Sequence, residues 1–335
     1  MPREAAAPPA PNLMIVAQAG RLAFEALLFA ASLRHASPGF RGRLLVAEPQ
    51  PEAAWEGVDT RIPDPIRAHL QDLGGEIIPF TARHFGVAYP YGNKIEALEV
   101  LPAGEPFLFF DTDTLVTGPL DRADTAGTTA TASMRRGPTW PEPPPYGPGY
   151  AGIWGSLYDR FGLDISGSLD RRFAEDDWER YLYFNAGWFF AIDPQAFRQR
   201  FLGWALAVRD DPGEALACQK IDVLLDQVVL PLVVHSLGGG RPGPGFDGLD
   251  GDLTCHYRDP ALLYARESDR AVQVLEEITA GQPLRRLLRD WPAAKEMIHR
   301  RAGEKRVRPL FDRRSGPPNE GRTRQQLKKL GLWSR

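Results

Sequence analysis

The chain has 335 residues and a formal net charge of -3 at pH 7, with 43% hydrophobic and 25% charged residues. This length is enough for one large hydrophobic core with an appended segment, and the near-neutral charge gives no reason to expect nucleic acid as a partner. The two cysteines, Cys218 and Cys255, form neither a disulfide framework nor a Cys-x-x-Cys motif, so we expect a reducing compartment and a cytoplasmic protein. The sequence contains no apolar run of about 18 residues, which predicts that it has no membrane span.

Residues 1–12 are rich in alanine and proline and are predicted to be disordered. Strands are then predicted at 13–17, 43–47, 76–80 and 107–110, and helices at 21–35, 64–73 and 91–101. This alternation predicts an α/β fold with a mostly parallel central sheet and helices on both faces. Ligands of such sheets bind beyond the carboxyl ends of the strands.

The second half of the chain is less regular. Proline and glycine are dense between residues 135 and 150, so 134–180 is predicted to be an insertion. A strand at 181–192 and a helix at 194–208 follow, and then a Gly/Pro loop at 238–251 and helices at 269–277 and 284–301. We therefore expect a catalytic domain at 13–267 and C-terminal helices at 268–335, with the basic segment from residue 300 onwards outside the core.

Two aspartates follow the fully apolar strand at 107–110. Asp111 and Asp113 are two residues apart, so on an extended chain both carboxylates point to the same side. Paired carboxylates at this position suit a hard divalent cation that also binds phosphate oxygens. A second Asp-x-Asp triplet, at Asp250 and Asp252, encloses a glycine and is expected to be a solvated turn.

Further motifs stand before and after these aspartates in a characteristic order. They are Asn93-Lys94-Ile95-Glu96-Ala97-Leu98, Tyr183-Phe184-Asn185-Ala186-Gly187, Leu225-Asp226-Gln227 and His256-Tyr257. Over residues 13–260 this order resembles the GT-A glycosyltransferases, particularly the family-8 type that includes glycogenin and bacterial lipooligosaccharide galactosyltransferases. The resemblance implies a GT-A fold and hexosyl transfer, with retention, from a nucleotide-sugar donor such as a UDP-sugar.

The same resemblance implies a role for each matching residue. Asp111, Asp113 and His256 would hold the metal, and the imidazole favours Mn²⁺ over Mg²⁺. Asp226 and Gln227 would lie beneath the anomeric carbon as the catalytic pair. The donor would be bound by Gln18, Lys94, Asp111, Asn185, Ala186 and Gly187.

The chain departs from the family pattern in three places. Arg258 stands where the family has a Gly and Lys that hold the pyrophosphate, and it could replace the lysine through bidentate phosphate contacts. The insertion carries Trp140, Tyr146, Tyr150 and Trp154, which could stack on acceptor sugar rings, unless this segment is a Pro-rich lid without a ligand. The basic C-terminal tail could contact an anionic membrane that presents a lipid-linked acceptor, or it could be a solvated extension. A saccharide or protein acceptor is equally compatible with the sequence.

Two alternatives from other functional classes stay open. The segment from Phe109 to Leu115 also resembles the first motif of haloacid-dehalogenase-type phosphatases, in which Asp111 would be the nucleophile and Asp113 the general acid. The altered pyrophosphate segment is also compatible with a non-catalytic protein that binds nucleotide sugars.

Overall fold

The structure is a computed structural model that describes residues 10–134, 137–313 and 316–333. The strands are β1 (Asn12–Val16), β2 (Leu44–Pro49), β3 (Gly75–Phe80), β4 (Phe107–Phe110), β5 (Thr114–Val116), β6 (Ala130–Met134), β7 (Phe184–Ala191) and β8 (Thr254–His256). The α-helices are α1 (Arg21–Ala36), α2 (Asp64–Asp72), α3 (Asn93–Glu96), α4 (Tyr150–Arg160), α5 (Pro194–Asp210), α6 (Leu225–Ser236), α7 (Pro260–Arg266), α8 (Asp269–Ala280), α9 (Gln282–Leu287), α10 (Pro292–Ala294) and α11 (Glu320–Lys329).

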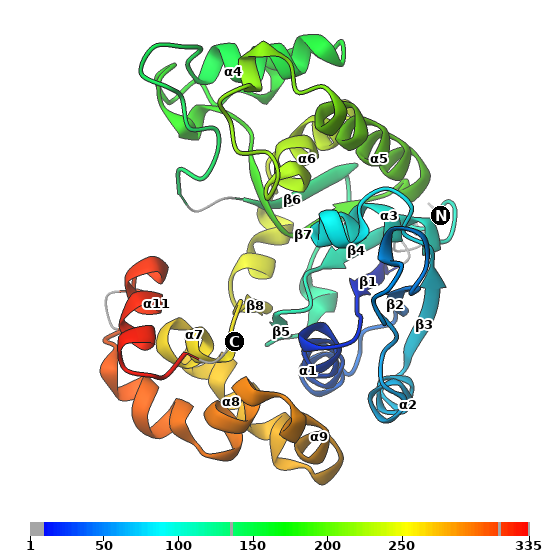
Figure 1. The fold of residues 1–335 in the computed structure, drawn as a ribbon, viewed down its shortest axis with the longest axis vertical. Coiled ribbons are helices and arrows are strands. Elements are labelled where there is room, and N and C mark those ends of the chain that lie inside the picture. The colour runs from blue at the N-terminus through cyan, green and yellow to red at the C-terminus, as the bar shows by residue number, and fades with distance from the viewer. Residues whose placement is uncertain (1–9, 135–136, 314–315, 334–335) are drawn as a thin grey trace, which may run out of the picture.

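A six-stranded sheet of order β3-β2-β1-β4-β7-β6 forms the centre of the molecule (Figure 1). β1 runs parallel to β2 and β4, and β2 runs parallel to β3. β7 is antiparallel to both of its neighbours, β4 and β6. The mostly parallel sheet predicted from the sequence is therefore confirmed, with one reversed strand near its edge.

Both faces of the sheet are covered, as the apolar strands predict. In β4, Leu108 and Phe110 belong to the core cluster that contains α1, α2 and α8, whereas Phe107 and Phe109 belong to the cluster that contains α5 and α6. This is the two-residue alternation of an extended strand. β4 is buried on both faces, and the polar residues that follow it begin at the carboxyl end of the strand. Asp111 is the first of these residues.

A second, two-stranded sheet lies just beyond that point. β5 pairs with β8 in antiparallel register, with Thr114 opposite His256. Neither short strand is predicted from the sequence, because three residues are too few to show a period. This pairing brings a late part of the chain back to the end of β4.

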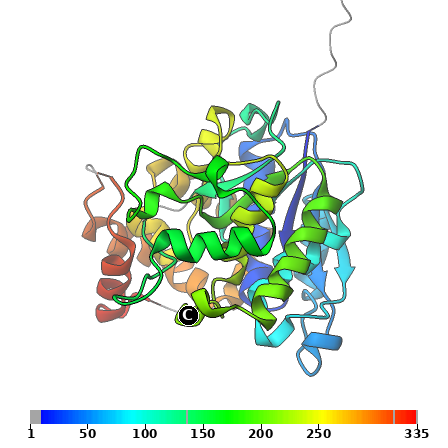
Figure 2. The same ribbon diagram turned by 90° about the horizontal axis from the view of Figure 1, so that it is seen from above.

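The C-terminal segment corrects one prediction. Residues from 300 onwards were expected to lie outside the core, but Val307, Phe311, Leu327 and Leu332 are buried in the same cluster as α1 and β1. The segment wraps back over the molecule, and α11 lies on the opposite side from β3 in both views (Figures 1 and 2). The predicted domain boundary at residue 267 stays a prediction, and one hydrophobic core contains side chains from both 13–267 and 268–335.

Other differences from the predicted elements are local. Asn12 belongs to β1, so the predicted disorder does not extend to this residue, and the prediction for residues 1–9 lies outside the described residues. The helix predicted at 284–301 is interrupted, because Pro292 forces Trp291 into an extended conformation. The insertion contains the helix α4, which the sequence did not predict. Among the described residues, no helix combines the length and the apolar character needed to span a bilayer.

Candidate active site

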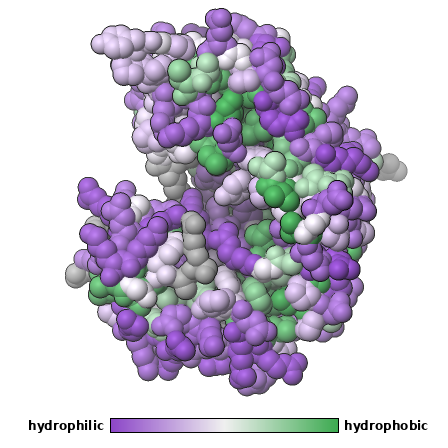
Figure 3. All heavy atoms as spheres, in the orientation of Figure 1, coloured by the Kyte–Doolittle hydropathy of each residue, from purple (hydrophilic) through white to green (hydrophobic). Residues whose placement is uncertain are grey.

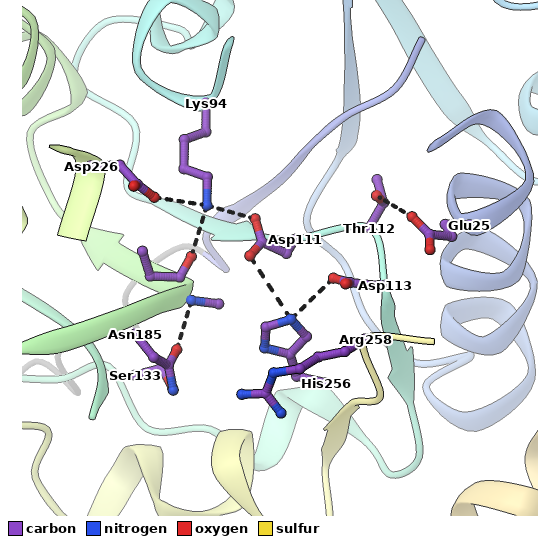
Figure 4. Close-up of polar contacts among 12 residues, drawn as sticks. Glu25, Lys94, Asp111, Thr112, Asp113, Ser133, Asn185, Asp226, His256 and Arg258 are labelled. Atoms are coloured by element: carbon purple, nitrogen blue, oxygen red, sulfur yellow. Dashed lines mark hydrogen bonds and ion pairs between the residues drawn. The ribbon is translucent and has the colours of Figure 1, made fainter. Parts of the chain in front are cut away.

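Asp111, Asp113 and His256 converge at the carboxyl end of β4. One ligand atom from each lies within 4.8 Å of the others, and this is the one such group of three found among the described residues. His256 Nε2 is 3.0 Å from Asp113 Oδ1 and 3.9 Å from Asp111 Oδ2 (Figure 4). Two carboxylates and one imidazole form a donor set that suits Mn²⁺ or Mg²⁺, and the three side chains are half-buried rather than sealed.

The backbone explains why the imidazole reaches the carboxylates. The β5–β8 pairing continues with a hydrogen bond from the Tyr257 amide to the Asp113 carbonyl, at 2.9 Å. Gly187 leaves room for the ring, because a Cβ at this position would lie 2.4 Å from His256 Nδ1. A glycine is therefore required here for steric reasons.

The predicted donor-sugar motif lies in an irregular part of β7. The register between β6 and β7 shifts between Ala132 and Met134, as in a β-bulge. Within it, Asn185 Oδ1 accepts a hydrogen bond from the Gly187 amide at 2.8 Å, and Ala186 has a φ of 56°. This turn aims the Ala186 carbonyl at Lys94 Nζ, 3.4 Å away.

Lys94 joins the metal-binding group to the predicted catalytic residues. Its Nζ lies 2.9 Å from Asp111 Oδ1 and 3.2 Å from Asp226 Oδ2 (Figure 4). Asp226 is 2% exposed, and its carboxylate accepts a hydrogen bond of 2.7 Å from the Tyr89 hydroxyl. Lys94 is thus a buried cation between two carboxylates, and not a solvated charge on a helix face. Asp226 belongs to the first turn of α6.

The charges in this group set the protonation states. Burial raises the pKa of Asp111, and repulsion from Asp113 adds to the rise, although Lys94 opposes it. Burial also acts to raise the pKa of Asp113, but His256, Arg21 and Arg258 together outweigh it and lower the pKa to about 2. Burial would lower the pKa of His256, yet Asp113 raises it above the usual value. Because a metal ligand must be a neutral imidazole, cation binding would displace the proton from His256.

A buried acid behind the site was missed by the sequence analysis. Glu25 of α1 is fully buried, accepts a hydrogen bond from Thr112 Oγ1 at 3.3 Å and lies 3.3 Å from Arg21 Nε. Burial raises its pKa well above the usual value, and repulsion from Asp113 adds to this. The four-residue spacing of Arg21 and Glu25 on one predicted helix was the available signal.

Two cavities are lined by members of the Asp111, Asp113 and His256 group. One, of about 320 Å³, is lined by Val16, Tyr91, Lys94, Asp111 and Asp113, among others. The other is a cleft of about 910 Å³ between β8 and residues 311–320, and its lining includes His256, Arg258 and Asn185. Figure 3 shows this face hollowed, with largely hydrophilic residues in the depression.

The remaining predicted residues occupy the surroundings of these cavities. Gln18 Oε1 accepts a hydrogen bond of 2.9 Å from Asn93, which lines the smaller cavity. Gln227 Oε1 accepts a hydrogen bond of 3.0 Å from the Tyr183 hydroxyl. Arg258 lies beside His256 (Figure 4), and its guanidinium group contacts Glu320 at 3.3 Å.

The predicted stacking role of the insertion aromatics is wrong for the two tryptophans. Trp140 and Trp154 are 1% and 0% exposed and pack edge to face against each other in the core, so they have no face to offer a sugar. Tyr150 stacks on Tyr181, whereas Tyr146 is fully exposed. Amphipathic aromatic residues fit either role in a sequence, and only their burial distinguishes the two.

The mostly parallel sheet and the Asp111, Asp113 and His256 group fit the predicted GT-A architecture, and a comparison with protein families shows the class of enzyme. Residues 13–238 match the family model described as the Rhodobacterales glycosyltransferase domain. The match spans more than half of the chain, so the protein belongs to this glycosyltransferase family. The predicted class of enzyme is confirmed, and the phosphatase alternative is rejected.

Solved structures with similar folds are also glycosyltransferases by name. The galactosyltransferase LgtC, in complex with donor and acceptor sugar analogues, is 17% identical over 81% of this chain and 96% of its own, with a TM-score of 0.45. The apo bifunctional glycosyltransferase WbbM is 11% identical over 83% of this chain and 51% of its own, with a TM-score of 0.46. Mouse xyloside xylosyltransferase 1 is 12% identical over 64% of this chain and 80% of its own, with a TM-score of 0.35. At these values the roles of individual residues do not carry over, and a search of curated proteins gave no match.

Proposed function

We propose that the protein transfers a hexose from a nucleotide sugar, most simply a UDP-sugar, to an acceptor, with a divalent cation held by Asp111, Asp113 and His256. The observation that carries this proposal is the convergence of these three ligands beside two cavities in a chain of this family. The cation, Mn²⁺ by preference, would neutralise the charge that develops on the leaving diphosphate.

The protein's own side chains have distinct parts in this proposal. Lys94 bridges Asp111 and Asp226 and holds the two carboxylates side by side, so both can face the donor. Asn185, Ala186 and Gly187 shape the wall against the donor sugar, and Gln18 supports the nucleotide side through Asn93.

The proposal includes retention of the anomeric configuration. Asp226 is held by Tyr89 and Lys94, which suits it to orienting sugar hydroxyls rather than attacking carbon. Gln227 is a poor nucleophile, so an attack by the acceptor on the same face as the departing diphosphate is favoured.

A thermal-shift screen tests the donor. UDP-sugars and other nucleotide sugars are added with and without Mn²⁺, since a ligand that binds the folded state raises the melting temperature. We expect a UDP-sugar to stabilise the protein in the presence of Mn²⁺ and to release UDP slowly by hydrolysis. Failure of every nucleoside diphosphate sugar to shift the melting temperature with any divalent cation would overturn the proposal, and binding without any turnover would favour the non-catalytic alternative.

The second Asp-x-Asp triplet supplies a matched control. Asp113→Asn removes one ligand charge and should abolish the Mn²⁺-dependent part of the shift. Asp252→Asn changes an exposed carboxylate in Asp250-Gly251-Asp252 and should leave that shift unchanged.

Acceptor and location stay predictions. Tyr146 is the exposed aromatic residue of the insertion that suits contact with a saccharide or lipid-linked acceptor. Leu327 and Leu332 face the core, so membrane contact by the tail would depend on its arginine and lysine side chains. Both cysteines are free, in keeping with the predicted cytoplasmic location.

A further inference from the structure

Glu320, the first residue of α11, reaches into the cleft beside the metal-binding group. Its Oε2 lies 3.3 Å from Arg258 Nη1 and 3.1 Å from Arg266 Nη1, and its Oε1 lies 2.8 Å from Arg324 Nη2. One carboxylate therefore faces three guanidinium groups. This cluster joins the C-terminal segment to the loop after β8.

The other acidic groups lie farther from these guanidinium groups than Glu320 does. Arg266 is also 4.0 Å from Glu267, and Asp259 interacts with Arg324 at longer range. Asp259 itself is buried and caps α7 through the Ala261 amide, so it is not available to the cleft. Glu320 is therefore the acidic partner closest to the guanidinium groups at the cleft wall, and Arg258 stands two residues along the chain from His256.

Glu320 is held by a well-anchored helix. Asn319 caps α11 through the Arg322 amide at 3.1 Å, and Leu327 of the same helix is fully buried. Glu320 itself is 28% exposed, and so is accessible to a competing ligand from the cleft. Release of its carboxylate needs only a change of side-chain rotamer and no unfolding of the helix.

We propose that Glu320 occupies the anion position into which Arg258 and Arg266 receive the donor diphosphate, so that the carboxylate must leave before the donor binds fully. This inference rests on the proposed function and adds Arg266 as a diphosphate ligand and Glu320 as a built-in competitor. A diphosphate carries more charge than a carboxylate and offers more acceptor oxygens to a guanidinium pair. Glu320 lowers the affinity for the donor. When no donor is bound, its carboxylate reduces the repulsion between the two arginines.

The test is the affinity for UDP in the presence of Mn²⁺, measured by titration calorimetry on the full chain. Glu320→Gln keeps the shape of the side chain and removes the competing charge. We expect UDP to bind roughly three- to tenfold more tightly to this variant, because UDP no longer has to displace the ion pairs of Glu320 with Arg258 and Arg266. Glu304→Gln is the matched control, because Glu304 forms an exposed pair with Arg301 elsewhere on the surface and should leave the affinity unchanged.

A double variant tests whether the gain in UDP affinity depends on Arg258. In the Arg258→Ala background the gain from Glu320→Gln should shrink to about twofold or less, since one of the two released guanidinium groups is missing. Unchanged or weaker UDP binding by Glu320→Gln would overturn the inference alone, because Glu320 would then merely position the arginines. Absence of UDP binding to both the unaltered protein and the variant would overturn the proposed function together with the inference.

Discussion

At the scale of single residues, Gly187 has the most specific steric role in the site. A Cβ here would lie 2.4 Å from Nδ1 and 2.9 Å from Cε1 of His256. Gly187→Ala should therefore displace the imidazole and weaken Mn²⁺ binding by about 10- to 100-fold, the range seen when the support of a metal ligand is removed. Calorimetric titration of Mn²⁺ measures this loss, and an affinity equal to that of the unaltered protein would contradict the steric role.

Individual site residues differ in how far the sequence predicts them. Asp111 and Asp113 follow a wholly apolar strand, so their place at a sheet end is predictable from local pattern alone. His256 could be assigned only by resemblance, because the strand that carries it has three residues. Glu320 could not be assigned, since its contacts with Arg258 and Arg266 join distant parts of the chain, and for Glu25 only the four-residue spacing from Arg21 was a local signal.

Aromatic residues show the limit of chemical reasoning without burial. Trp140 and Trp154 have the chemistry of a sugar platform, yet they are buried in the core, where they pack against each other and against Tyr183. A side chain of this size contributes far more to folding when it is buried than when it is exposed. The packing of these tryptophans therefore decides their role, and the amino-acid sequence alone does not predict that packing.

At the scale of elements, α7 is capped by a buried acid whose ionisation costs stability. Burial raises the pKa of Asp259 to about 6, against an ordinary value of 3.8, and its carboxylate accepts a hydrogen bond from the Ala261 amide at 2.8 Å. The folded state thus binds this proton more tightly than the unfolded state does. The contribution of Asp259 to stability should fall as the pH rises from about 4 to about 6.

Asp259→Asn keeps the cap and removes the titration. Relative to the unaltered protein, this variant should gain about 1–3 kcal/mol between pH 4 and pH 7. Urea unfolding at both pH values measures the free energy of unfolding of the variant and of the unaltered protein. The difference between the two proteins removes the contribution of the other carboxyl groups, which both share. A constant difference across this range would show that the ionisation of Asp259 carries no cost.

The interior of α5 offers a stabilising change that also serves as a control. Gly203 is exposed, lies within the helix, and has no heavy atom within 4 Å of the position that a Cβ would take. Gly203→Ala should raise the free energy of unfolding by about 0.5–1 kcal/mol, because alanine restricts the unfolded chain. The same variant should bind Mn²⁺ as tightly as the unaltered protein does. It therefore shows that the weaker Mn²⁺ binding expected for Gly187→Ala depends on where the methyl group is added. A lower stability on urea unfolding would contradict the assigned environment.

At the scale of the whole molecule, the basic C-terminal segment is part of the core. Leu327 is fully buried, whereas Leu330, three residues further along the chain, is 46% exposed. Leu327→Ala should cost about 2–5 kcal/mol, and Leu330→Ala should change stability by no more than about 0.5 kcal/mol. Equal effects on urea unfolding would mean that the segment is the solvated extension expected from its composition.

The composition of the C-terminal segment led to the wrong prediction that it lies outside the core, and the reason is physical. The segment from Arg300 onwards is dense in arginine and lysine, and such runs are usually solvated. Long basic side chains can nevertheless cover apolar neighbours, as Arg324 and Lys328 do over the Trp333 ring. The sheet could be predicted because its strands repeat a local period, whereas the attachment of the tail depends on a few isolated leucines.

The β5–β8 pairing has a consequence for biosynthesis. Asp111 and Asp113 leave the ribosome long before His256, and the helices that bury the end of the chain are made last. A nascent chain therefore exposes two carboxylates without their imidazole partner. On the proposed function, the cation site would be completed only when β8 has paired with β5, and a product truncated before β8 would lack one of the three proposed ligands.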